Sequence, residues 1–155
     1  MRLEEMLSIK YPFIQGGMAN IATGEFAAAV SNAGGLGLIG AGGMNTEMLR
    51  DNIRKCKELT DKPFGVNLML MNPDAEEMAS MIVEEGVKIV TTGAGSPAKY
   101  MPMWKENNMI VMPVVLVALI KMMSPEFAAN FTTPVGIIAT TLGVICFVGA
   151  YKVGQ

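Results

Sequence analysis

The strongest constraint on the fold of this chain is a repeat of short apolar runs, most of which are followed by glycine or asparagine. The runs cover residues 12–15, 36–41, 64–70, 87–92 and 109–115. They begin about 25 residues apart, with helix-like segments between them, which is the spacing of alternating strands and helices. The pattern predicts an α/β fold with parallel strands, because right-handed crossovers place every strand end on one side.

The number of repeats indicates part of a barrel. Five βα units are present by residue 115, whereas a closed (β/α)₈ TIM barrel has eight strands and about 250 residues. The chain has 155 residues. We therefore predict five βα units of a TIM barrel in residues 1–115, with open sheet edges that could pair with a second copy of the chain.

Cap residues mark where the intervening helices begin. Thr23, Asp74 and Ser96 each precede a helix-like segment, and either Asn45 or Thr46 precedes another. The glycines of residues 35–40 have the spacing of a dinucleotide-binding loop, but they precede and occupy a predicted strand instead of opening a helix. We expect these glycines to have a structural role.

Composition excludes several functions. The net charge is −2 without a basic patch, which argues against nucleic-acid binding. The chain has no histidine and two unclustered cysteines, so we expect no metal site, no histidine general base and a reducing cytoplasmic location for residues 1–115.

The last third of the chain differs from the rest. After residue 108 the charged residues are Lys121, Glu126 and Lys152. Residues 135–151 are uncharged, and their length is near the lower limit of about 17 residues for a membrane helix. We expect residues 116–155 to form an apolar helical tail, either a membrane hairpin or a helix packed on the open barrel.

Residues at the predicted strand ends are the candidates for binding. Asparagine is unfavourable inside a strand, yet Asn67 lies between Val66 and Leu68, where its amide could bind a flavin edge or fix a loop. Residues 91–95 offer hydroxyls and backbone N–H groups, and Gln15 could contact a ligand or a loop.

Four motifs together carry a family resemblance. They are residues 11–18 (YPFIQGGM), 33–40 (AGGLGLIG), 61–70 (DKPFGVNLML) and 84–97 (EEGVKIVTTGAGSP). The chain up to about residue 115 resembles FMN-dependent type II enoyl-acyl-carrier-protein reductases and the related nitronate monooxygenases. The Gln-Gly-Gly-Met form of residues 15–18 favours the reductase.

The resemblance implies a flavoprotein oxidoreductase of fatty acid biosynthesis, with NAD(P)H as reductant and an acyl-carrier-protein thioester, or alternatively a small nitroalkane-like compound, as substrate. By position, the residues implied to contact the flavin are Gly16, Gly17, Met18, Asn67, Thr92 and Gly93. The family's phosphate loops and catalytic histidine come from strands six to eight, for which we find no match, and no catalytic residue can be assigned. We therefore expect weak FMN binding or none, and little or no activity, from this chain alone.

The tail has a second resemblance. Residues 124–127 (SPEF) and 132–136 (TTPVG) are similar to the C-terminal membrane hairpin of type II secretion system F-type proteins. This implies a chimera whose tail is inserted in the inner membrane. The rival hypothesis is accordingly a membrane-anchored scaffold without catalysis.

Overall fold

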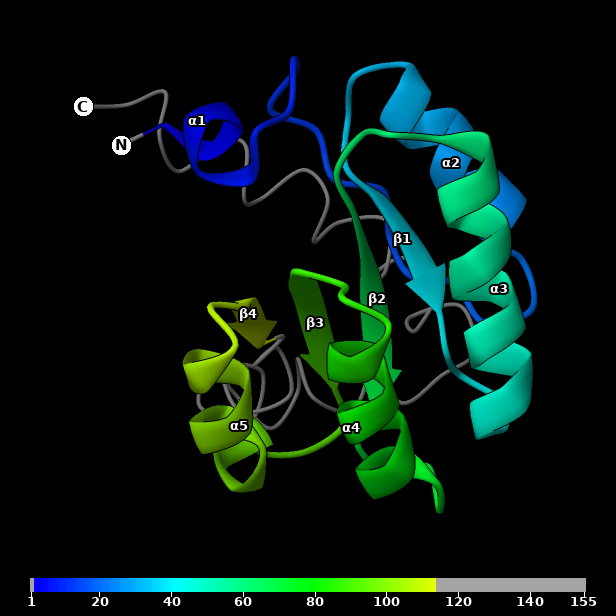
Figure 1. The fold of residues 1–155 in the computed structure, drawn as a ribbon, viewed down its shortest axis with the longest axis vertical. Coiled ribbons are helices and arrows are strands. Elements are labelled where there is room, and N and C mark those ends of the chain that lie inside the picture. The colour runs from blue at the N-terminus through cyan, green and yellow to red at the C-terminus, as the bar shows by residue number, and fades with distance from the viewer. Residues whose placement is uncertain (1, 114–155) are drawn as a thin grey trace, which may run out of the picture. The chain divides into compact units, whose positions relative to one another are not determined.

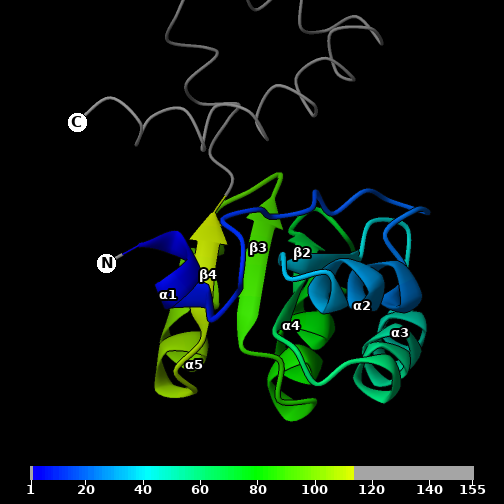
Figure 2. The same ribbon diagram turned by 90° about the horizontal axis from the view of Figure 1, so that it is seen from above.

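The computed structural model describes residues 2–113, which form a parallel sheet flanked by helices. The sheet has the order β1-β2-β3-β4, and all neighbouring strands are parallel. The strands are β1 (Gly37–Gly40), β2 (Phe64–Met69), β3 (Ile89–Gly93) and β4 (Ile110–Pro113). The arrowheads of β3 and β4 point the same way in Figure 2. Because the strand order follows the chain order, each connection is one βα unit of a barrel.

The helices between the strands follow one another around the outside of the curved sheet (Figure 1). They are α2 (Gly24–Asn32), α3 (Thr46–Leu59), α4 (Ala75–Glu84) and α5 (Met101–Glu106), the last preceded by the short 3₁₀ helix η1 (Pro97–Lys99). A short helix, α1 (Leu3–Leu7), begins the described part of the chain. The predicted α/β fold class is confirmed as a parallel sheet that matches part of a TIM barrel.

Two apolar clusters stabilise the two faces of the sheet. On the outer face, Val66, Leu68 and Val90 pack with Ile53 of α3 and Trp104 of α5, all of them fully buried. On the inner face, side chains from the α1 region cover the strands. This second cluster contains Leu7, Ile9, Leu36, Leu38 and Ile89. The side chains of each strand therefore alternate between the helices and the barrel interior, as the period of two requires.

The prediction of a first strand over residues 12–15 is wrong. Over residues 12–15 the structure has a single parallel bridge, between Ile14 and Leu36. Pro12 has no N–H to donate, and the Phe13 amide donates to the Tyr11 carbonyl at 2.7 Å in a turn. One bridge still places this segment beside β1, as the first unit of a barrel would be.

Most predicted caps are confirmed. Thr23 accepts a hydrogen bond from the Phe26 amide, and Asn45, the cap of α3, accepts one from the Met48 amide at 2.9 Å. Ser96 caps η1. Asp74 is the exception, because its side chain caps nothing, and Asn72 accepts from the Asp74 amide instead.

Within residues 2–113, no helix combines the length and the apolar character needed to cross a membrane. The predicted membrane segment 135–151 and the whole tail 116–155 lie outside the described residues.

Candidate functional site

The candidate site lies where the strands end, in the loops that follow residue 15, β1 and β3. The loop after residue 15 touches the loop after β1. A Cβ added at Gly42 would lie 3.1 Å from the Ala19 side chain, and one at Gly43 would lie 3.6 Å from Asn20. The Gly40 amide also donates to the Ala22 carbonyl at 2.8 Å. The edge of the sheet at which the strands end, called the rim below, is therefore continuous from the loop after residue 15 to the loop after β1.

The strand register sets one row of residues across the inner face of the sheet. Gly40 pairs with Asn67, Asn67 with Thr91, and Thr91 with Met112. Parity assigns this row to the inner face, because Leu38 and Ile89, two residues before Gly40 and Thr91, belong to the inner cluster. The row has an amide and a hydroxyl at its centre.

Asn67 connects the first loop to the sheet. Its Nδ2 donates to the Gly17 carbonyl at 3.3 Å, and its Oδ1 accepts from the Thr91 hydroxyl at 2.8 Å. Its own carbonyl accepts from the Ala41 amide at 3.0 Å. Of the two roles considered for Asn67, the structure contains the loop-fixing one, and the half-buried side chain retains a second N–H for a ligand.

Gly16, Gly17 and Met18 form the loop that Asn67 holds, and all three are half-buried. A Cβ at Gly17 would lie 2.2 Å from the Asn67 Cβ, which no side chain can tolerate. The Met18 carbonyl lies against β1, 2.7 Å from where a Gly40 Cβ would stand. These backbone approaches bring together four of the six predicted flavin contacts: Gly16, Gly17, Met18 and Asn67.

Gly93 ends β3 on the same face as Thr91. Among residues 2–113, no heavy atom lies within 4 Å of a Cβ added there. The lack of a described neighbour beside Gly93 and the second N–H of Asn67 are both compatible with a flat ring such as a flavin. Thr92 points the other way, toward the helices, because it alternates with Thr91 and shares a face with Val90.

The Thr92 hydroxyl is buried and has no hydrogen-bond partner within residues 2–113. Thr91, which was not among the six, is the hydroxyl that reaches Asn67. Alternation along the strand could have distinguished the two threonines, because Ile89 and Thr91 share one parity. The resemblance names Thr92 as a flavin contact, which stays a prediction, whereas the hydroxyl that reaches Asn67 is that of Thr91.

Gln15 has a structural role. Its Oε1 accepts from the Leu38 amide at 2.9 Å, and its Nε2 donates to the Gly16 carbonyl. The residue is 5% exposed. The Gln15 side chain thus supplies the acceptor that a longer first strand would have supplied, and of the two roles considered it has that of fixing a loop.

The site offers hydrogen bonds and space but few ionisable groups. The groups with displaced pKa values are Glu25, Cys56, Glu85 and Lys99, on or beside the outer helices. In the part of the chain that the structure describes, no three metal-ligating side chains gather. Within residues 2–113 the site therefore offers an amide N–H, a hydroxyl and backbone groups as its polar contacts.

Comparisons with known proteins agree with this geometry. The family profile "Nitronate monooxygenase" matches residues 1–96. A probable nitronate monooxygenase of Staphylococcus aureus is 48% identical over 83 residues, covering 54% of this chain and 23% of the relative. A Mycobacterium tuberculosis protein, (3aS,4S,5R,7aS)-5-hydroxy-7a-methyl-1-oxo-octahydro-1H-indene-4-carboxyl-CoA dehydrogenase, is 33% identical over 113 residues, covering 73% of this chain and 32% of the relative.

Solved structures give the same answer for the fold. FabK from Thermotoga maritima has a TM-score of 0.72 and 46% identity, over 78% of this chain and 39% of that one. A nitroalkane oxidase from Streptomyces ansochromogenes has a TM-score of 0.65 at 20% identity, covering 73% and 42% of the two chains, which shows the fold alone. The chain spans less than half the length of each of these relatives. With the profile match covering residues 1–96, the chain belongs to the nitronate monooxygenase family, to which the FabK-type reductases are related.

Proposed function

We propose that residues 1–115 are the N-terminal part of an FMN-dependent oxidoreductase of the enoyl-acyl-carrier-protein reductase type. The observation that carries this proposal is the Asn67 amide, held between the Gly17 carbonyl and the Thr91 hydroxyl. It stands on the same face of the sheet as the open space beside Gly93. An amide N–H at the edge of a flat space suits the hydrogen-bonding edge of a flavin ring.

Each predicted residue has a part in this proposal. Gly16, Gly17 and Met18 let the backbone approach the ring closely, and Asn67 donates a hydrogen bond to it. Gly93 leaves room for the ring plane, and Thr92 contributes through its backbone, because its side chain faces the helices. FMN, when bound, supplies hydride transfer from NAD(P)H to the double bond of an enoyl thioester.

The described residues orient a ring without completing a reaction centre. Because the whole chain lacks histidine, no imidazole can donate or accept a proton here. The resemblance assigns the phosphate loops to strands six to eight, beyond the matched segment. We therefore infer that the chain alone holds FMN weakly and turns over slowly or not at all.

The reductase type is favoured by the Gln-Gly-Gly-Met motif and by 46% identity with FabK from Thermotoga maritima over 78% of the chain. The coenzyme A thioester in the name of the Mycobacterium relative supports a thioester substrate. The second candidate is a nitronate monooxygenase, favoured by the profile match and by 48% identity to the Staphylococcus protein. Substrate tests separate the two candidates.

The first experiment measures flavin binding by the full chain. FMN and riboflavin are each titrated with protein, and quenching of the flavin fluorescence gives a Kd. We expect both flavins to bind with similar weak affinity, because the residues of the site contact the ring and not the phosphate. Asn67→Leu should weaken binding, and Ser80→Ala, at an exposed position of α4, should not. Absence of binding by the wild-type chain would refute the proposal.

The second experiment supplies substrates to the flavin-loaded chain. Oxidation of NAD(P)H that depends on a crotonyl thioester would identify a reductase, and oxygen uptake with an alkyl nitronate would identify the monooxygenase. We expect slow or absent turnover with either substrate. FMN bound far more tightly than riboflavin would instead mean that a phosphate site exists in this chain, and it would overturn the inference of a weak cofactor site.

A further inference from the structure

Thr91 is a buried hydroxyl with one defined hydrogen-bond partner, and the family resemblance assigns it no role. The residue is 6% exposed and pairs with Asn67 across β2 and β3. Its Oγ1 lies 2.8 Å from the Asn67 Oδ1. Its neighbour Thr92 is 1% exposed, but its hydroxyl finds no partner within residues 2–113. The two adjacent threonines therefore provide a natural comparison.

The direction of the hydrogen bond follows from the partners of Asn67. The Gly17 carbonyl can only accept, so the amide atom 3.3 Å from it must be the nitrogen. The other amide atom, which faces Thr91, is then the oxygen, and an oxygen without hydrogens can only accept. The Thr91 hydroxyl must donate. The two hydrogen bonds therefore run in one direction. The Thr91 hydroxyl donates to Asn67 Oδ1, and Asn67 Nδ2 donates to the Gly17 carbonyl.

We propose that Thr91 is a positioning residue that fixes the orientation of the Asn67 amide. With Oδ1 held by the hydroxyl, the amide cannot turn its oxygen toward the rim. One N–H of Nδ2 goes to Gly17, and the second is left for a ring acceptor at the strand ends. This inference rests on the proposed flavin site for its ligand, but the hydrogen bond itself exists without one.

Strand geometry explains why a threonine suits this position. A β-branched side chain is stiff at χ1, so the hydroxyl remains aimed at the neighbouring strand. The register keeps Asn67 directly opposite, where side chains of adjacent strands meet. Valine has nearly the same shape and lacks the hydroxyl, so Thr91→Val removes the donor and leaves the packing in place.

The first test needs no flavin. In the ¹⁵N-labelled full chain, the side-chain amide pair of Asn67 is assigned by its loss in Asn67→Asp. We expect Thr91→Val to shift that pair and Thr91→Ser to keep it near the wild-type position, because serine retains the donor. Thr92→Val is the matched control. It removes a neighbouring buried hydroxyl that faces the other side of the sheet, and it should leave the Asn67 pair in place.

The second test measures the Kd of riboflavin and FMN by fluorescence quenching. Thr91→Val should weaken both by between about twofold and about tenfold, the range for one net hydrogen bond. Thr91→Ser should restore the wild-type affinity. Circular dichroism on each variant identifies any that fails to fold, and in that case Thr91→Ser and Thr91→Ala replace the valine comparison.

The outcomes separate this inference from the proposed function. An unchanged Asn67 signal in Thr91→Val would overturn the positioning role, whatever the flavin does. Weakening by serine as large as that by valine would mean that retaining the hydroxyl does not retain the affinity, and it would overturn the role as well. A wild-type chain that binds neither flavin removes the proposed function and the ligand of this inference together, while the amide signal still reports the hydrogen bond.

Discussion

Gly17 and Asn67 approach so closely that a Cβ added to Gly17 would lie 2.2 Å from the Cβ of Asn67. The same approach places the Gly17 carbonyl 3.3 Å from the Asn67 Nδ2. The first loop and the end of β2 therefore share one contact surface, and only a glycine permits it. This contact explains why residue 17 is a glycine and why residue 67, inside β2, is an asparagine.

Gly17→Ala should displace the first loop from β2. We expect a loss of about 1–3 kcal/mol in the free energy of unfolding, the usual cost of overpacking, together with weaker flavin binding. Urea unfolding and fluorescence titration measure the two effects. Gly42→Ala is the milder comparison, because its Cβ would stand 3.1 Å from the Ala19 Cβ, a contact that a shift of a few tenths of an ångström relieves. Equal stability of Gly17→Ala and wild type would contradict the described contact.

Gly93→Ala should leave the fold intact and impair the site. The new Cβ has no heavy atom of residues 2–113 within 4 Å, so we expect a change in the free energy of unfolding within about 0.5 kcal/mol. It would occupy the space proposed for the ring, so riboflavin should bind less tightly. Gly37→Ala is the contrasting variant, because its Cβ would fall 1.9 Å from the Ala27 carbonyl oxygen and should destabilise the fold. Unchanged riboflavin affinity in Gly93→Ala would remove Gly93 from the site.

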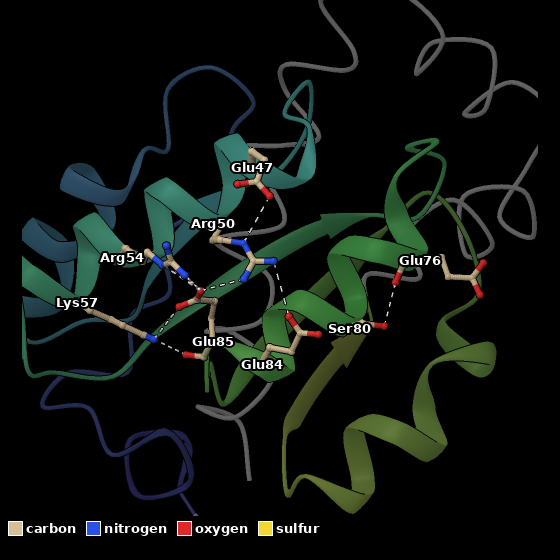
Figure 3. Close-up of polar contacts among 8 residues, drawn as sticks. All are labelled: Glu47, Arg50, Arg54, Lys57, Glu76, Ser80, Glu84 and Glu85. Atoms are coloured by element: carbon tan, nitrogen blue, oxygen red, sulfur yellow. Dashed lines mark hydrogen bonds and ion pairs between the residues drawn. The ribbon is translucent and has the colours of Figure 1, made fainter.

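Outside the site, Glu85 joins α3 to the end of α4 (Figure 3). Its carboxylate accepts from Arg50 at 3.2 Å, from Arg54 at 2.9 Å and from Lys57 at 3.3 Å. The side chain is 11% exposed. Partial burial by itself raises the pKa of Glu85, but the hydrogen bonds from Arg54, Lys57 and Arg50 outweigh it and hold the pKa below its ordinary value.

Glu85→Gln should destabilise the chain by about 1–3 kcal/mol at neutral pH, the range for charge-assisted hydrogen bonds. Because the folded pKa is lowered, the contribution of the carboxylate is complete above its ordinary value of 4.5 and is lost as the pH falls through the folded pKa. The stability difference between wild type and Glu85→Gln should therefore shrink below pH 4.5. Urea titrations at several pH values measure it.

The control for this prediction is Glu77→Gln, at an exposed position of the same helix. It should change the free energy of unfolding by less than about 0.5 kcal/mol. A difference between wild type and Glu85→Gln that grows on acidification would have the wrong sign and would contradict the lowered pKa.

Local signals in the sequence were enough to predict most of the fold. The apolar runs located β1 to β4, and Thr23 and Asn45 marked helix starts through contacts within one turn. The ion pairs of Glu85 were not predicted, because its partners lie on α3, about 30 residues earlier in the sequence. Such a contact depends on how two helices pack, and the residue pattern within one helix does not predict that packing.

The candidate site was predictable to a smaller extent. Asn67 was identified because it stands where strand propensity disfavours it, and the glycines because they follow apolar runs. The Thr91 hydroxyl was not separated from that of Thr92, because the choice depends on which face of the sheet each side chain occupies. The prediction of a strand over residues 12–15 was wrong for a related reason, since the backbone pairing stops at Leu36 and the Gln15 side chain accepts from the Leu38 amide instead.

Cys56 supplies the last prediction. It is fully buried on α3, and burial, followed by the negative charge of Glu25, raises the pKa of its thiol from 9.0 to about 12. In a Cys146→Ser background, the native chain at pH 8 should react with an aromatic disulfide reagent far more slowly than the urea-unfolded chain, because the thiolate is the nucleophile.

Because the folded pKa of Cys56 is raised, the contribution of its thiol to stability is complete below pH 9.0 and falls above it, as the thiol of the unfolded chain ionises first. At pH 10 the expected loss is on the order of 1 kcal/mol. Cys56→Ala in the same background should lack this part of the alkaline loss, and rapid labelling of the native chain at pH 8 would contradict the buried position of Cys56.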